Sequence, residues 1–140
     1  MAKFVLQMDE PTPDYILIGV SCHQKDYRAA WAIGNSMGLE FARDEEPYTI
    51  VQKNGTKAYF TSFSYFPSQE ERYLLLANKS EFGTLLPELT QFDFILLIYS
   101  LISDEEVEDL VKQIRSHSLI QFCSLFNGEQ MKHASRLPIF

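Results

Sequence analysis

The sequence predicts an α+β domain with a mostly antiparallel or mixed sheet of about six strands and two helices packed on one face. Residues 15–21 and 93–100 are apolar on both alternating faces, as in central strands that are covered on each side. Residues 25–37 and 104–117 carry apolar side chains at helical spacing. Aromatic and β-branched segments joined by turn residues lie between these units, so the expected order is β-α-β-β-β-β-α-β.

The first helix is expected soon after the first strand. Tyr27 and Trp31 share one apolar stripe with Gly34, and Gly38 is placed to end the helix in a left-handed conformation. A glycine inside a helix costs stability relative to alanine. We therefore expect Gly34 to let a neighbouring backbone or ring come close.

Residues 48–52, 57–66 and 72–79 predict a three-stranded antiparallel meander. The Asn54-Gly55 pair between the first two segments favours a tight hairpin. The middle strand lacks a clearly polar face, because aromatic side chains occupy both of its faces. The aromatic residues on one of these faces are candidate binding residues: Tyr59, Phe63 and Tyr65.

The second helix has a clear start signal. Ser103 and Glu106 are spaced to form a capping box. Residues 119–126 predict the last strand. We expect the central strands 15–21 and 93–100 to lie side by side and parallel, with the antiparallel strands inserted between them along the chain.

The chain is expected to form one domain over residues 1–140, which is a common domain size. Residues 1–13 and 127–140 are expected to be a flexible N-terminal segment and a C-terminal tail. If both helices cover one face of the sheet, the apolar side chains on the other face also need cover. A partner, a second subunit or the apolar tail must supply it.

The composition bounds the choice of partner and compartment. The chain is 46% hydrophobic and 22% charged, with a net charge of -7 from 19 acidic and 12 basic residues. A negative surface repels phosphate backbones and anionic lipid, so we expect neither nucleic acid nor a membrane as partner. The apolar run at 94–99 is too short to span a bilayer, and the N-terminus lacks a secretory signal pattern. We expect a cytoplasmic protein.

The cysteines and histidines give no sign of a metal site or a disulfide. Cys22 and Cys123 lie about a hundred positions apart without metal-ligand spacing, which favours buried free thiols. Cys22 and His23 form the most enzyme-like pair. Adjacent residues of an extended segment project to opposite faces, however, so we expect a packed thiol and a surface histidine.

The sequence carries no known motif that would identify a catalytic residue, a metal site or a cofactor site. The chain contains no GxGxxG, Walker A, GxSxG, HExxH or kinase signature. The acidic run Asp44-Glu45-Glu46 lacks the spacing of a calcium loop, so we expect it to be a loop of solvated charges.

The segment Leu86-Pro87-Glu88-Leu89-Thr90-Gln91-Phe92-Asp93-Phe94 resembles the signature of the bacterial IPExxxVDY family, which has no assigned biochemical function. The resemblance extends to residues 15–39, 77–79 and 137–140, and so covers most of the chain. Pro87, Glu88 and Asp93 match the signature. Three positions differ, where Leu86, Phe92 and Phe94 stand in place of Ile, Val and Tyr.

Two interpretations of this segment remain open. In the structural one, Pro87 sets a turn, Glu88 bonds loop amides and Asp93 accepts local N–H groups at the start of a strand. In the functional one, Glu88 and Asp93 belong to a polar site near the carboxyl end of the first strand. The position of Asp93 at the beginning of its own strand argues against that site. The other candidate members of the site are Asp26, Tyr27 and Arg28.

Two classes of function follow from these observations. The first is a non-enzymatic binding or protein-interaction module, with a homodimer through the helix-free sheet face as one form of it. The second is a small-ligand receptor or an enzyme with a polar site near Glu88, Asp93, Arg28 and His23. A closed pocket that holds two of these side chains would distinguish the second from the first.

Overall fold

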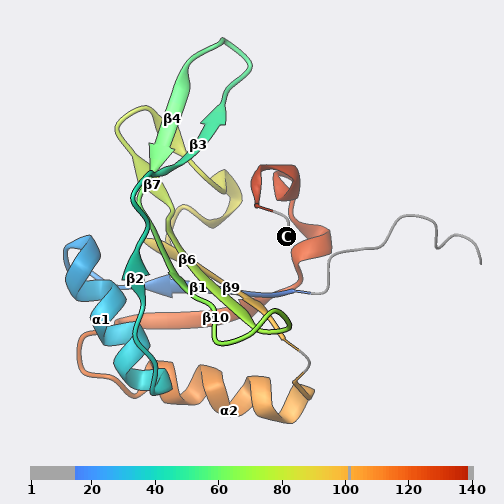
Figure 1. Cartoon of the computed structure of the whole chain (residues 1–140). Helices are drawn as coiled ribbons and strands as arrows, with labels where there is room; N and C mark the ends of the chain where they lie inside the picture. Colours follow the sequence, from blue (N-terminus) through green and yellow to red (C-terminus); the bar gives the residue numbers. More distant parts are fainter. Residues whose placement is uncertain (1–14, 101, 139–140) are drawn as a thin grey trace, which may run out of the picture.

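The computed structural model describes residues 15–100 and 102–138. It has two helices and a six-stranded sheet in which all neighbouring strands are antiparallel, which confirms the predicted α+β class (Figure 1). In order across the sheet the strands are β10 (Phe122–Phe126), β1 (Ile16–Ser21), β9 (Phe94–Tyr99), β6 (Arg72–Ala77), β5 (Ser62–Tyr65) and β2 (Ala42–Arg43).

Both helices lie close to the ranges that the sequence predicts. Helix α1 (Asp26–Met37) ends at Gly38, which has a φ of 75° and so adopts the left-handed conformation expected of it. Helix α2 (Asp104–Arg115) begins with the predicted capping box, in which both reciprocal bonds between Ser103 and Glu106 measure 3.1 Å. The two helices pack side by side on the same face of the sheet (Figure 1).

The prediction of parallel central strands is wrong. Strands β1 and β9 are neighbours, as expected, but they pair antiparallel, with Ile16 opposite Ile98 and Val20 opposite Phe94. A parallel pair needs a helix that carries the chain from one strand to the next. Helix α1 instead leads toward β2 at the far edge, and the chain returns through β5 and β6 before it reaches β9.

The predicted hairpin is present, but it belongs to a separate sheet. Strands β3 (Tyr48–Val51) and β4 (Lys57–Phe60) pair around a turn in which Gly55 has a φ of 86°. At Thr61 the chain leaves the hairpin and enters β5, so the expected single strand 57–66 is two strands. The hairpin extends away from the six-stranded sheet (Figure 1). A third small sheet pairs β7 (Lys79–Ser80) with β8 (Gly83–Thr84).

The helix-side face of the sheet forms the first core. Alternate residues of the central strands, such as Ile18 and Leu96, pack against Ile33 of α1 and Ile114 of α2. Gly34 lies where α1 approaches the following segment, because a Cβ there would be 2.7 Å from the Leu39 carbonyl oxygen. The close approach expected at this glycine is therefore confirmed.

The helix-free face forms a second core that is covered by the chain itself. Its sheet residues include the fully buried Leu17, Leu76 and Leu97. The cover comes from the β3–β4 hairpin, the segment before β9 and the C-terminal segment, through Ala58, Phe60, Leu85, Leu86, Leu89, Phe92 and Leu137. Of the three expected sources of cover, the tail contributes, and two internal segments do the rest.

The C-terminal segment is folded as far as the structure describes it. Two short 3-10 helices, Gly128–Gln130 and Ala134–Arg136, lead to Leu137, which is 4% exposed. The Tyr48 hydroxyl donates to the Arg136 carbonyl oxygen, and the Tyr99 hydroxyl donates to that of Pro138 at 2.6 Å. These two bonds attach the C-terminal segment to β3 and β9, and the prediction that residues 127–140 form a flexible tail stays a prediction. Residues 1–13, expected to be flexible, and 139–140 lie outside the described residues.

The two edges of the sheet differ. Strand β2 has two residues, both exposed. Strand β10 is longer, and its Cys123 lies opposite Val20 of β1. The Val20 carbonyl oxygen points toward β9, where it accepts from the Asp93 N–H. Val20 and Cys123 are therefore not hydrogen-bonded to each other, and the main-chain groups of Cys123 point away from β1. The outward Cys123 carbonyl oxygen accepts a bond from Arg115 Nε of α2 at 2.9 Å. The Arg115 guanidinium also lies 5.6 Å from the centre of the Phe122 ring.

Candidate binding site on the helix-free face

Asp93 lies at the carboxyl end of β1. The antiparallel pairing of β1 with β9 produces this arrangement and removes the objection that Asp93 stands at the wrong end of its strand. Its Oδ2 accepts from the Cys22 N–H at 3.0 Å and from the Ser21 hydroxyl at 3.4 Å. Lys79 Nζ lies 3.5 Å from Oδ1, and His23 Nε2 lies 3.9 Å from Oδ2. The structure thus brings His23 to Asp93.

Glu88 faces a different part of the molecule. Its carboxylate accepts from the main-chain N–H of His133 at 2.9 Å, and its Oε1 lies 2.8 Å from His133 Nδ1. Burial alone would raise the pKa of Glu88, but the hydrogen bonds from His133 outweigh it and hold the pKa below the ordinary value. Within the described residues, no hydrogen bond or ion pair joins Asp93 to Glu88 or Arg28.

Cys22 and His23 point to different surroundings. The Cys22 side chain is 1% exposed, and its Sγ donates to the Leu119 carbonyl oxygen at 3.2 Å. Burial raises the pKa of this thiol, which keeps it protonated and weakly nucleophilic. The His23 side chain is 69% exposed. Cys123 is also a buried free thiol, and burial raises its pKa to about 11, so the prediction of packed thiols is confirmed.

A buried asparagine organises the segment that carries Glu88. Asn78 is fully buried, and its Nδ2 donates to the carbonyl oxygens of Leu89 and Phe92 at 2.9 and 3.0 Å. Its Oδ1 accepts from the Leu86 N–H at 2.8 Å. Because each polar atom of its amide has a partner, Asn78 fixes this segment on the helix-free face. Sequence reasoning did not assign a role to this residue.

The predicted aromatic binding residues and Arg28 do not form one surface. Tyr59 projects outward from β4 with 51% exposure. Phe63 is buried on the helix side, and Tyr65 packs beside Tyr73 with ring centres 5.8 Å apart. Arg28 is exposed on α1. The break at Thr61 and the change of sheet separate Tyr59 from Phe63 and Tyr65, which a continuous strand would place together.

A groove of about 460 Å³ lies on the helix side, between α1 and β2. Phe63 and Phe41 line it together with Arg43 of β2. Tyr27 and Trp31 line it from α1 and are 67% and 56% exposed. Large aromatic side chains with this exposure are typical of protein-binding surfaces.

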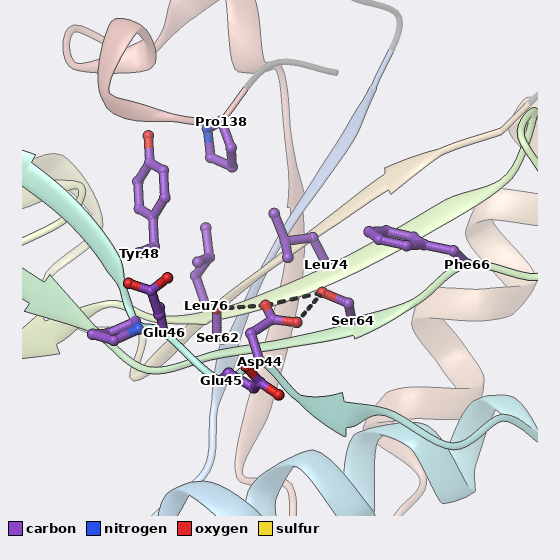
Figure 2. Close-up of a pocket in the computed structure, with 11 residues that line it drawn as sticks. Asp44, Glu45, Glu46, Tyr48, Ser62, Ser64, Phe66, Leu74, Leu76 and Pro138 are labelled. Atoms are coloured by element: carbon purple, nitrogen blue, oxygen red, sulfur yellow. Dashed lines mark hydrogen bonds between the residues drawn. The ribbon is translucent and has the colours of Figure 1, made fainter.

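A second cavity lies on the helix-free face, over β5 and β6, where the cover by the chain is incomplete. Its volume is about 440 Å³. Figure 2 shows Leu74 and Leu76 of β6 in the middle of its lining residues, with Tyr48 and Pro138 toward one side and Phe66 toward another. We call this cavity the acidic pocket. Its lining residues are Asp44, Glu45, Glu46, Pro47, Tyr48, Ser62, Ser64, Phe66, Leu74, Leu76 and Pro138.

Asp44 is held in place by two hydroxyls of β5. The Ser62 hydroxyl donates to Asp44 Oδ2 at 2.6 Å, and the Ser64 hydroxyl lies 2.8 and 3.0 Å from the two carboxylate oxygens (Figure 2). The Asp44 N–H also donates to the Ser62 carbonyl oxygen at 2.9 Å, which extends the pairing of β2 with β5. The carboxylate is therefore fixed over the helix-free face.

The acidic pocket carries three carboxylates and is lined by no basic side chain among the described residues. No described Lys, Arg or His pairs with Asp44, Glu45 or Glu46. These carboxylates are not gathered as metal ligands, since the described residues contain no group of three His, Cys, Asp or Glu side chains that could hold a metal ion. The arrangement can attract a cation that is larger than a metal ion.

The sequence held a partial signal for the acidic pocket. The spacing of the run 44–46 fits no calcium loop and so predicts a loop of solvated charges. Ser62 and Ser64 alternate with aromatic residues, which places two hydroxyls on one face of an otherwise apolar strand. Pairing of β2 with β5 could have linked the two features, but sequence pattern alone does not give strand neighbours.

No helix in the described part of the chain is long and apolar enough to cross a membrane. Comparisons of this chain with protein-family models, with curated proteins and with solved structures found no match in any of the three.

Proposed function

We propose that this chain is a non-enzymatic binding module for another protein and that the acidic pocket is its binding site. The observation that carries the proposal is the cavity itself, whose volume of about 440 Å³ falls within the usual range for ligand sites. An apolar floor with a few fixed polar groups is the usual composition of such sites. Leu74 and Leu76 supply the floor, and Asp44 supplies a fixed polar group.

The placement of the reactive side chains supports binding over catalysis. Cys22 is a buried thiol with a raised pKa, and Glu88 is engaged with His133. Asp93 accepts a main-chain bond and lies beside Lys79. None of these groups lines the acidic pocket. The resemblance of residues 86–94 to the IPExxxVDY family stays a prediction, and it adds no activity to this proposal.

A partner of different sequence is favoured over a second copy. The apolar residues that motivated a homodimer, such as Leu17 and Leu97, are buried by the chain's own segments. The open part of that face carries Asp44, Glu45 and Glu46, and two such surfaces would repel each other. Sedimentation of the full chain over a range of concentrations tests the homodimer prediction, which a constant monomer mass would contradict.

The binding proposal can be tested with peptides selected from a displayed random library on the full chain. We expect the bound peptides to shift backbone amide signals of Ser62, Ser64 and Leu76, because these residues surround the pocket. Phe66→Ser should weaken binding about tenfold, since aromatic anchors carry much of the binding energy in interfaces.

Phe82→Ser is the matched control for this test. Phe66 and Phe82 are 52% and 56% exposed, but only Phe66 lines the acidic pocket. Peptides that bind elsewhere, or that respond equally to both substitutions, would contradict the proposal. Failure to select any peptide that binds the folded chain would contradict it as well.

A further inference from the structure

We infer that the partner inserts an arginine or lysine side chain, flanked by an apolar residue, into the acidic pocket. This inference rests on the proposed function and specifies the chemistry of the partner. Three features of the pocket support it, which are its charge, the buried leucines among its lining residues and the surface around it.

Charge complementarity selects a cation. Asp44, Glu45 and Glu46 line the pocket together, and no basic side chain is among its described lining residues (Figure 2). The net charge of -7 adds a long-range attraction for a positive partner. A fixed carboxylate such as Asp44 binds ammonium or guanidinium groups through charge-assisted hydrogen bonds.

The apolar floor selects a cation that is carried on an aliphatic stem. Leu74 and Leu76 are 5% and 0% exposed, and in Figure 2 both side chains lie between Asp44 and Pro138. Lysine and arginine bury their methylene groups on apolar surface while the charged end stays near water or carboxylates. Tyr48 and Phe66 supply aromatic rings, and such rings also attract cations.

The surroundings of the pocket select a protein as the source of this cation. Arg43 lines the aromatic groove on the helix side, and its neighbour Asp44 lines the acidic pocket on the opposite face. The two hollows therefore lie on either side of the edge that β2 forms, with Tyr27 and Trp31 exposed beside the first. A free polyamine would occupy the acidic pocket alone, whereas a protein can contact both sides of this edge.

The test uses three defined probes in titrations that follow backbone amide signals of the full chain. The first is an acetylated Gly-Leu-Arg-Leu-Gly amide. In the second, citrulline replaces arginine and keeps its shape without the charge. The third is free butylguanidine. We expect the arginine peptide to bind about tenfold more tightly than the citrulline peptide, and binding to weaken as sodium chloride is added.

Substitutions in the pocket provide a second test. The double change Glu45→Gln and Glu46→Gln should weaken the arginine peptide about tenfold and leave the citrulline peptide unchanged. Both residues are exposed, so the fold should be retained. Glu105→Gln with Glu108→Gln removes the same charge from the exposed face of α2 and should have no comparable effect.

The outcomes distinguish failure of the cation inference alone from failure of the proposed function. Equal binding of the two peptides at the acidic pocket would overturn the cation inference and leave the binding proposal intact. If butylguanidine binds as tightly as the arginine peptide, the pocket recognises the free cation and the commitment to a protein side chain is wrong. If neither these probes nor library peptides reach the pocket, both proposals fail.

Discussion

Glu88 is an example of a residue whose role depends on a distant partner. The carboxylate is held by the N–H and the ring nitrogen of His133, which lies 45 positions further along the chain. Its predicted structural role was bonding to loop amides. The observed role is of that kind, although the amide belongs to the C-terminal segment, and pattern alone does not identify such a partner.

Glu88→Gln should lower the free energy of unfolding by about 1–2 kcal/mol at neutral pH, because a charge-assisted hydrogen bond becomes a neutral one. The pKa of Glu88 is lowered in the folded chain, so the ionised carboxylate stabilises the fold above the ordinary value of 4.5. This contribution is lost as the pH falls through the folded pKa. Urea unfolding of both chains at neutral pH and at a pH below the folded pKa measures this contribution to the free energy of unfolding.

Glu105→Gln, an exposed change of the same chemistry, serves as the control. A deficit for Glu88→Gln that persists undiminished in acid would mean that the loss comes from side-chain shape and not from charge. The contribution of the hydrogen bonds between Glu88 and His133 to stability would then depend little on ionisation of Glu88.

Residues whose partners are close along the chain are the ones that the sequence predicts correctly. Gly38 and the Ser103–Glu106 pair were predicted correctly, because their roles depend on residues within one helical turn. Asn78 and Asp44 depend on partners that only the tertiary fold brings near. Local rules therefore identify helix ends, whereas the candidate site needed the strand order.

At the scale of elements, Thr61 shows how aromatic residues on both faces of a segment can mislead. Phe60 is buried on the helix-free face and Phe63 on the helix side, and each belongs to a different strand. A run with two apolar faces was predicted as one strand. No glycine or proline marks the break, because the single residue Thr61 carries the chain from one sheet to the other without a hairpin turn.

Gly34→Ala should destabilise the fold by about 1–3 kcal/mol, although alanine favours an isolated helix. The new methyl group would stand 2.7 Å from the Leu39 carbonyl oxygen, which is main chain and cannot turn aside. Asn35→Ala, at an exposed neighbouring position of α1, should be neutral or slightly stabilising. Thermal unfolding compares the two, and a gain in stability for Gly34→Ala would show that the segment after α1 can shift.

For the whole molecule, the cover of the helix-free face of the sheet is the feature that the sequence predicts only in part. The two-sided apolar pattern of β1 and β9 predicted that this face needs cover. The apolar tail is one of three sources that the sequence predicts, but the pattern does not single it out or identify the internal segments, because Phe92 and Leu137 carry no periodic signal in their irregular segments. Both cores share strands β1, β6 and β9, so we expect the chain to unfold as one unit.

Leu137→Ala tests whether the two cores unfold together. The residue is 4% exposed in the second core, and its truncation should cost about 2–3 kcal/mol. Trp31, the single tryptophan, reports from the opposite side of the sheet. Its fluorescence and the circular dichroism should lose their folded signals at the same lower denaturant concentration. Ser135→Ala should leave both transitions in place, and a shift of only one signal for Leu137→Ala would mean that the two cores melt separately.

The bond from Arg115 to the outward carbonyl oxygen of Cys123 has a consequence for how copies of this protein behave when crowded. An open strand edge can recruit strands from other molecules and begin a fibril. Here the longer edge is occupied by a charged side chain, and the opposite edge offers only two residues. Replacement of Arg115 would therefore harm colloidal behaviour more than folding. We therefore expect the Arg115 guanidinium to hinder strands of other molecules from pairing with this edge.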